Sequence, residues 1–133
     1  MKIQVDTREQ KPFTKCKAWK DVEYEVVTLK TADYSNGSIT IERKGVGDFI
    51  NCCGKSKTRF LKELERGFDY LIVEGSIPEF QKYLKKVRSR MHVNYIVHML
   101  KEIRREYGIE VILCSNREEA AKLARHLLLK GAL

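Results

Sequence analysis

Acidic side chains and one lysine gather in the first third of the sequence, although the whole chain carries a net charge of +8. The group consists of Asp6, Arg8, Glu9, Asp33, Glu42, Arg43, Lys44 and Asp48. A carboxylate can hold a divalent cation, and an ammonium group beside it can orient water or stabilise charge on phosphate oxygens. This combination of residue types suits metal-assisted hydrolysis of a phosphodiester.

The residues around Glu42 predict the strand that would position it. In the segment 38–43, Ile39 and Ile41 alternate with polar residues, which is typical of a strand. Side chains two positions apart point to the same face of a strand. Glu42 and Lys44 are therefore expected to emerge together at the strand's end. The turn sequence at 35–37, Ser-Asn-Gly, leads into this strand and predicts an antiparallel hairpin.

The rest of the chain alternates between predicted strands and helices. Segments 3–5, 23–29, 70–75 and 109–113 are expected to be strands, the last two buried. Helices are expected at 47–53, 58–66, 78–85, 92–107 and 117–129, with Pro78 in a first turn, Gly108 as a stop and Asn116 in a cap. The pattern predicts an α/β fold with a central mixed sheet flanked by helices, and parallel later crossovers.

The composition favours a polyanionic partner. The chain of 133 residues is long enough for one domain with a proper core. Its 26 Lys and Arg residues against 18 Asp and Glu residues point to nucleic acid first. A membrane partner is disfavoured, because no long apolar run or basic amphipathic anchor is found.

The cysteines and histidines suggest neither disulfides nor zinc. The four cysteines, Cys16, Cys52, Cys53 and Cys114, form no C-x-x-C pair, and the three histidines have no ligand spacing. No signal peptide opens the chain. We therefore expect reduced thiols in an intracellular protein, in the cytoplasm or nucleoid or in the host cell of a mobile or viral genome.

Two basic runs lie after the acidic group. The first contains Lys55, Lys57, Arg59 and Lys62, and two interpretations stay open for it: contact with a DNA backbone, or a solvated loop and helix face. The second contains Lys82, Lys85, Lys86, Arg88 and Arg90, and a solvated face is the preferred interpretation. Phe13 and Trp19 are expected to cover the edge of the core rather than to stack on bases.

Three segments together resemble the nuclease motif of the XPF–Hef family of structure-specific endonucleases. They are Val-Asp-Thr-Arg-Glu at 5–9, Asp-Tyr at 33–34 and Glu-Arg-Lys-Gly-Val-Gly-Asp at 42–48. Segments 70–75 and 111–120 are similar to the family's buried strand and its last strand and helix, so the resemblance covers essentially the whole chain. It implies a restriction-endonuclease-like fold and hydrolysis of DNA with Mg²⁺ or Mn²⁺.

The resemblance also implies roles for individual residues. Asp33 and Glu42 would be the metal ligands, and Lys44 would position the attacking water. Asp6, Glu9 and Asp48 would complete or support the acidic pocket, while Arg8 and Arg43 would pair with these acids or with phosphate. The chain has Ala32 where the family motif has glycine, which reduces the freedom of the backbone beside Asp33.

The resemblance finally implies how the domain would be used. Residues 1–133 are expected to form a single nuclease domain without a helix-hairpin-helix or helicase domain. A homodimer is expected through the C-terminal helices, with part of the stripe 93–103 and Leu123, Leu127 and Leu128 facing a second copy. The preferred function is a metal-dependent DNA endonuclease acting on branched or otherwise structured DNA in repair, recombination or replication. A non-catalytic DNA-binding scaffold and a phosphodiesterase acting on RNA remain alternatives.

Overall fold

Six strands form one mixed sheet in the computed structural model, which describes residues 2–130. They are β1 (Ile3–Asp6), β2 (Tyr24–Val27), β3 (Tyr34–Ser35), β4 (Thr40–Lys44), β5 (Tyr70–Val73) and β6 (Glu110–Leu113), in the spatial order β2-β1-β3-β4-β5-β6. Strand β3 is antiparallel to its neighbours β1 and β4, and the other neighbouring pairs are parallel. The expected α/β fold with a central mixed sheet is confirmed.

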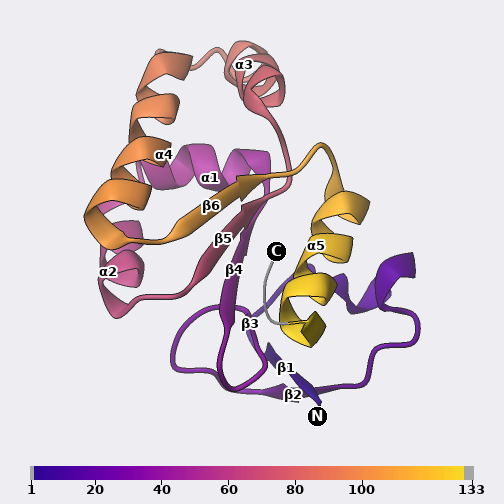
Figure 1. Cartoon of the computed structure of the whole chain (residues 1–133). Coiled ribbons are helices and arrows are strands. Elements are labelled where there is room, and N and C mark those ends of the chain that lie inside the picture. Colours follow the sequence, from indigo (N-terminus) through magenta and orange to yellow (C-terminus); the bar gives the residue numbers. More distant parts are fainter. Residues whose placement is uncertain (1, 131–133) are drawn as a thin grey trace.

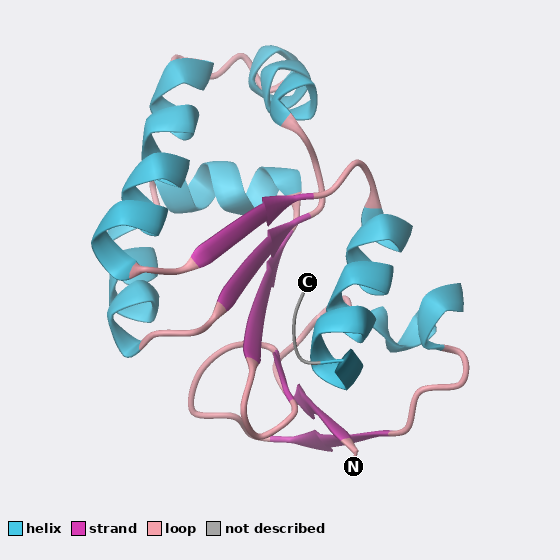
Figure 2. Cartoon of the chain, in the orientation of Figure 1, coloured by secondary structure: helices cyan, strands magenta, loops and turns pink. Residues whose placement is uncertain are grey.

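Helices cover both faces of this sheet (Figure 1). On one side lie α1 (Val46–Cys53), α2 (Lys57–Arg66), α3 (Ile77–Lys86) and α4 (Val93–Tyr107). On the other side lie α5 (Arg117–Lys130) and two short 3-10 helices, Phe13–Lys15 and Lys17–Trp19. Figure 2 shows the strands running between these two layers. Each crossover between parallel strands β4, β5 and β6 passes through the larger helical layer.

Local capping interactions set several of the helix ends. Ser76 and Glu79 form a capping box at the start of α3, where Pro78 occupies the first turn. Gly108 ends α4 in the left-handed conformation, with φ of 64°. The Asn116 side chain accepts a hydrogen bond from the Glu119 N–H at the start of α5 (2.9 Å). These three ends lie where the sequence predicted them.

Two apolar cores lie on the two sides of the sheet. The larger packs Phe49, Phe60 and Phe80 and the buried face of α4 against β5. The smaller packs Phe13, Trp19 and Tyr34 against α5, and the Trp19 indole donates to the Ala121 carbonyl at 2.8 Å. Phe13 and Trp19 therefore belong to the core, as expected. All four cysteines are free and buried.

The antiparallel hairpin predicted at the turn 35–37 is confirmed, and it joins β3 to β4. Strand β2, expected over 23–29, pairs in parallel with β1 and forms an edge of the sheet. The antiparallel partner of β4 is β3, a strand of two residues that is too short to show a periodic pattern. Asn36 closes the connection, because its Oδ1 accepts the N–H groups of Ser38 and Ile39 at 2.8 and 2.6 Å.

Two residues assigned to a dimer interface lie inside the chain's own core. Leu127 and Leu128 are buried on α5 against the second core, so they are not available to another copy. Leu123 is only partly buried, and Leu129 is exposed. Of the helices within residues 2–130, none is both long and apolar enough to cross a bilayer.

Candidate acidic active site

Strand β4 divides the Glu-Arg-Lys motif between the two faces of the sheet. Glu42 and Lys44 lie opposite Leu71 and Val73 of β5 and share the face covered by the larger helical layer. Arg43 points the other way, towards α5. The prediction that Glu42 and Lys44 emerge together is confirmed, because the Lys44 Nζ lies 3.2 Å from a Glu42 carboxylate oxygen.

An open depression of about 520 Å³ lies at this face of β4. Five of the residues predicted for the site line it: Asp6, Arg8, Asp33, Glu42 and Lys44. Lys30, Glu63 and Arg66 complete its polar lining, so cations from two further segments lie around the acids. The fold therefore brings carboxylates from β1, β4 and the loop before β3 to one place.

A left-handed residue positions Asp33. Ala32 has φ of 68°, a conformation that glycine adopts easily and alanine only at a cost in free energy. The turn directs Asp33 to β4, where its carboxylate accepts the backbone N–H of Arg43 at 2.8 Å. The alanine in place of the family's glycine is therefore accommodated, and the side chain of Asp33 stays in the depression.

Two carboxylates share the ammonium group of Lys44. Glu42 lies 3.2 Å away on the same strand, and Glu63 lies 3.6 Å away on α2. The Phe60 ring, one turn earlier on α2, lies 5.6 Å from the same nitrogen. Sequence reasoning missed Glu63. Its position between the buried residues Phe60 and Leu64 of a helix was the available signal that it borders the core.

Two acids of the depression, Asp33 and Glu42, resist ionisation. Burial raises the pKa of Glu42 well above its usual range, and the charge of Asp33 raises it further. Burial, followed by the charge of Glu9, also raises the pKa of Asp33. Burial disfavours the charge on Lys44, but Glu42 and Glu63 more than compensate and raise the pKa of Lys44. The site thus holds a firmly protonated lysine and a pair of carboxyl groups that cannot easily both be charged.

A hard divalent cation fits this donor set. Mg²⁺ and Mn²⁺ prefer carboxylate oxygens, and a cation beside Asp33 and Glu42 would relieve the unfavourable charge that raises their pKa values. Within residues 2–130, no group of three or more His, Cys, Asp or Glu side chains is arranged to hold a metal ion. The candidate ligands for a cation are the carboxylates of Asp33 and Glu42. Mg²⁺ commonly takes one or two carboxylates and fills its other positions with water and phosphate oxygens.

Asp6 lies in the depression with both its carboxylate oxygens engaged. Arg8 donates to them from Nε and Nη2 at 3.0 and 3.2 Å, and the Leu29 N–H donates at 2.8 Å. Although burial opposes ionisation, these donors lower the pKa of Asp6. The carboxylate therefore ties the end of β1 to the segment after β2, and the exposed Arg8 covers it.

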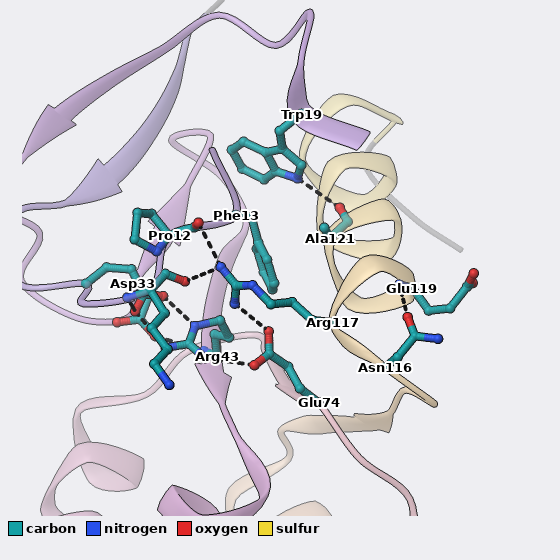
Figure 3. A network of polar contacts seen from close by, with 12 residues as sticks. Pro12, Phe13, Trp19, Asp33, Arg43, Glu74, Asn116, Arg117, Glu119 and Ala121 are labelled. Carbon is teal, nitrogen blue, oxygen red and sulfur yellow. Dashed lines mark hydrogen bonds and ion pairs between the residues drawn. The ribbon is translucent and has the colours of Figure 1, made fainter. Parts of the chain in front are cut away.

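Two further motif residues, Glu9 and Arg43, belong to a network on the opposite face (Figure 3). Arg43 donates to both oxygens of Glu9, at 2.8 and 2.9 Å, and to Glu74 at 3.0 Å. Arg117 of α5 donates to the other oxygen of Glu74 at 2.8 Å, and the Tyr34 hydroxyl donates to Glu9 at 3.0 Å. Burial opposes ionisation of Glu9, but Arg43 lowers its pKa overall. These charges alternate and hold the strands to α5.

Three predicted acidic-site residues therefore lie outside the depression. Arg43 is on the far face because adjacent residues of a strand point to opposite sides. Glu9 lies in the loop after β1 and binds Arg43 there. Asp48 is exposed in the first turn of α1, after the chain has turned away from β4. Glu74 and Arg117 were not predicted, and no local spacing links these residues, which are 43 positions apart.

The predicted DNA-binding lysines and arginine do not all lie on one surface. Lys55, Arg59 and Lys62 line a shallow hollow at the start of α2. Lys57 faces α4 instead, where its ammonium donates to the Tyr95 hydroxyl at 2.5 Å and lies 5.2 Å from the centre of that ring. Three of the four predicted residues thus line the same hollow.

The sheet, the helical crossovers and the acid–lysine depression define a mixed α/β domain with an acidic site at one face of its sheet. The chain belongs to the ERCC4 domain family, because its residues 5–127 match that domain. The family expected from the motif is therefore confirmed.

Solved structures share the fold. XPF from Aeropyrum pernix superposes with a TM-score of 0.78 at 21% identity, covering 98% of this chain and 65% of that one. XPF from the same organism in a complex with DNA gives 0.79 at 22% identity, covering 98% and 64%. The chain thus spans slightly less than two thirds of these proteins.

A longer sequence relative is also known. A Methanocaldococcus jannaschii protein that carries the name of an ATP-dependent RNA helicase is 31% identical over 128 residues. The match covers 92% of this chain but 15% of that protein. The similarity therefore concerns one region of a much larger chain.

Proposed function

We propose that the protein is a metal-dependent endodeoxyribonuclease that hydrolyses phosphodiester bonds in branched or otherwise structured DNA. One observation carries the proposal: Glu42 and Lys44 are paired at 3.2 Å beside Asp33 in an open depression. Buried acids with raised pKa values next to a charged lysine are typical of catalytic sites, whereas structural acids are usually neutralised.

Each side chain of the depression has a role in this proposal. Asp33 and Glu42 would hold Mg²⁺ or Mn²⁺, which when bound supplies an activated water and stabilises the leaving oxygen. Lys44 remains protonated, because its pKa is raised, and so acts as a hydrogen-bond donor rather than a base. Its ammonium would orient the water or stabilise charge on the phosphate oxygens.

The charges around the depression support DNA as the substrate. Arg8, Lys30 and Arg66 lie in its lining, and the net charge of +8 favours a phosphate backbone. Contacts of this kind position DNA without reading its bases. The structural relative solved in a complex with DNA is consistent with such binding. We therefore propose selection of DNA by its shape rather than by its sequence.

The first test is cleavage by wild-type protein and the Glu42→Gln variant. A panel of labelled flaps, forks, four-way junctions, single strands and linear duplexes would be incubated with Mg²⁺ or Mn²⁺. The variant keeps the size of the side chain and removes its charge, so metal binding and cleavage should both fail. DNA binding, measured by gel shift, should survive. If the variant cuts as well as wild type, the assignment of Glu42 is wrong.

The second test uses Lys44→Ala, which leaves both proposed metal ligands in place. Cleavage should fall by about 10²- to 10³-fold, the usual effect of losing one donor to developing charge. Metal binding, measured by calorimetry, should persist. Ca²⁺ should support DNA binding with little cutting. If wild-type protein binds DNA but cuts no DNA or RNA of a matched panel with either metal, the non-catalytic scaffold is the correct function.

The DNA path can be tested with a control on the same helix. Replacing Lys55, Arg59 and Lys62 with alanine should reduce the slope of log K against log salt by about 0.9 for each lost phosphate contact. Lys57→Ala changes the charge of the same segment, but its ammonium already binds Tyr95, so this slope should change less. If the slope falls by the same amount per replaced residue in both variants, the hollow has no special role in DNA binding.

We also propose that the protein forms a homodimer through the region of its last two helices. The helices α4 and α5 cover opposite faces of the sheet and precede and follow β6, so a second copy touching both would lie across that sheet edge. The exposed Leu129 and the half-buried Leu123 are the apolar residues left on α5. Sedimentation at micromolar concentration should give twice 15.5 kDa. A monomer would refute the dimer.

A further inference from the structure

We propose that Glu63 is a positioning residue of the acidic depression and holds the Lys44 ammonium in its working place. The proposal rests on the hydrolytic function proposed above. It adds to the motif a residue from α2, an element that carries none of the predicted catalytic acids.

The first observation is an unsatisfied oxygen. The Oε2 atom of Glu63 is buried and accepts no hydrogen bond from the residues that the structure describes. It lies 3.6 Å from the Lys44 Nζ, at ion-pair distance. A buried carboxylate oxygen without a donor is unfavourable, and native proteins keep such groups where another interaction or a function compensates. Here the compensating charge is that of Lys44.

The second observation is that Lys44 has two carboxylate partners with different tasks. Glu42 is the closer one, at 3.2 Å, but it is also a proposed metal ligand. A carboxylate that shares its charge with a divalent cation attracts a neighbouring ammonium less strongly. Glu63 comes from another element and is not one of the two proposed metal ligands. The lysine therefore retains an anionic partner when Glu42 serves the metal.

The third observation is that α2 is firmly anchored beneath this contact. Phe60 and Leu64, on either side of Glu63 in the sequence, are both buried in the larger core. The Phe60 ring also lies 5.6 Å from the Lys44 Nζ. The helix thus presents one charged and one aromatic group to the ammonium from a fixed position, which restricts where the amine can point.

The direct test follows the amine of Lys44 and needs no cleavage. Glu63→Gln removes the charge and keeps the size, so the Lys44 amine should be held less firmly and its acylation at pH 9 should rise. The expected increase is on the order of tenfold, because the amine loses one of the two carboxylates that pair with it. Mass spectrometry would compare Lys44 with the exposed Lys62 in the same sample.

The matched control is Glu65→Gln, which makes the same charge change two residues along on the exposed side of α2. It should leave the labelling of Lys44 unchanged. Glu63→Asp keeps the charge with a shorter side chain and should give intermediate labelling. If the melting transition shows that Glu63→Gln does not fold, the labelling of Lys44 in Glu63→Asp still tests the proposal. Labelling of Lys44 at the wild-type rate in the Glu63 variants would overturn the proposal.

Cleavage supplies a second measurement. Single-turnover cleavage by Glu63→Gln should fall by about 10- to 100-fold, the usual effect of removing a residue that orients a catalytic one. The DNA dissociation constant should stay at the wild-type value or decrease, because a negative charge is lost. Partial rescue by Glu63→Asp is expected. A wild-type protein that never cuts would refute the hydrolytic function, while the labelling result would still decide whether Glu63 holds Lys44.

Discussion

The two faces of β4 differ in how far their charged side chains are neutralised by partners. On the face towards α5, the guanidinium of Arg43 meets two carboxylates, and Arg117 completes the second one. On the face towards α2, burial and repulsion raise the pKa of Glu42. The first face is saturated with matched charges, whereas on the second face Glu42 and Glu63 share the one ammonium group of Lys44.

This difference teaches how three consecutive motif residues divide their tasks. Neighbouring side chains on a strand point to opposite sides, so Arg43 is separated from Glu42 and Lys44 by the sheet itself. The saturated network stabilises the fold, since its charges neutralise one another. On the other face, the burial and mutual repulsion of Asp33 and Glu42 lower the stability of the fold, and a bound cation would offset this cost.

The largest expected effect on stability is at the saturated face. Arg43→Met removes the charge and leaves Glu9 and Glu74 buried with an incomplete set of donors. Unfolding in urea should show a loss of about 3–5 kcal/mol, the usual cost of breaking a buried ion pair. Glu42→Gln serves as the control on the other face and should not destabilise the protein. A small effect of Arg43→Met would mean that the network contributes little.

The next effect concerns the metal. Mg²⁺ should bind the folded protein at Asp33 and Glu42 and stabilise it, by about 2.7 kcal/mol when its concentration is 100 times the dissociation constant. The melting temperature would be measured with and without Mg²⁺ in wild type and Glu42→Gln. The variant should lose the shift. An equal shift in both proteins would place the binding elsewhere.

The two faces of β4 should contribute to stability with opposite dependences on pH. Glu42 has a raised pKa in the folded state, so the folded protein binds more protons than the unfolded chain, and the stability from this group is lost as pH rises above about 4. Glu9 has a lowered pKa, so its contribution is present above about pH 4 and is lost as pH falls.

Variants of each face measure this contrast. The stabilisation of Glu42→Gln relative to wild type should grow from pH 4 to pH 8, by about 1.4 kcal/mol for each unit of raised pKa. The destabilisation of Glu9→Gln should shrink as the pH falls below 4. Urea unfolding across this range would check both. Parallel pH profiles for the two variants would contradict the division of β4 into two electrostatic faces.

The smallest effect tests how Asp33 is held. Ala32→Gly removes the strain of a left-handed alanine, which is about 1–2 kcal/mol. The greater conformational entropy of glycine in the unfolded chain offsets part of this gain in stability. A net gain of about 0.5 kcal/mol is expected from the urea midpoint. The proposed cleavage activity should be unchanged. A less stable variant would show that Ala32 contributes packing that outweighs the strain.

Much of the local structure was predictable because it depends on neighbouring residues. The alternation in β4 predicted that Glu42 and Lys44 share a face, and the turn signals at Pro78 and Gly108 predicted where helices begin and end. The spacing of the acids and the lysine indicated the chemistry. The family followed from the same residues.

Contacts between distant segments could be learned only from the tertiary structure. Glu63 reaches Lys44 because α2 packs over β4, and Arg117 lies more than 100 positions from the Lys11 carbonyl that it binds. Leu127 and Leu128 have the residue types of an interface, but the packing of α5 buries them. Periodicity depends on neighbours along the chain, whereas the neutralisation of one charge by another depends on how the elements pack. For this reason the sequence alone determined which acids and bases are present, and the fold decided which of them are matched.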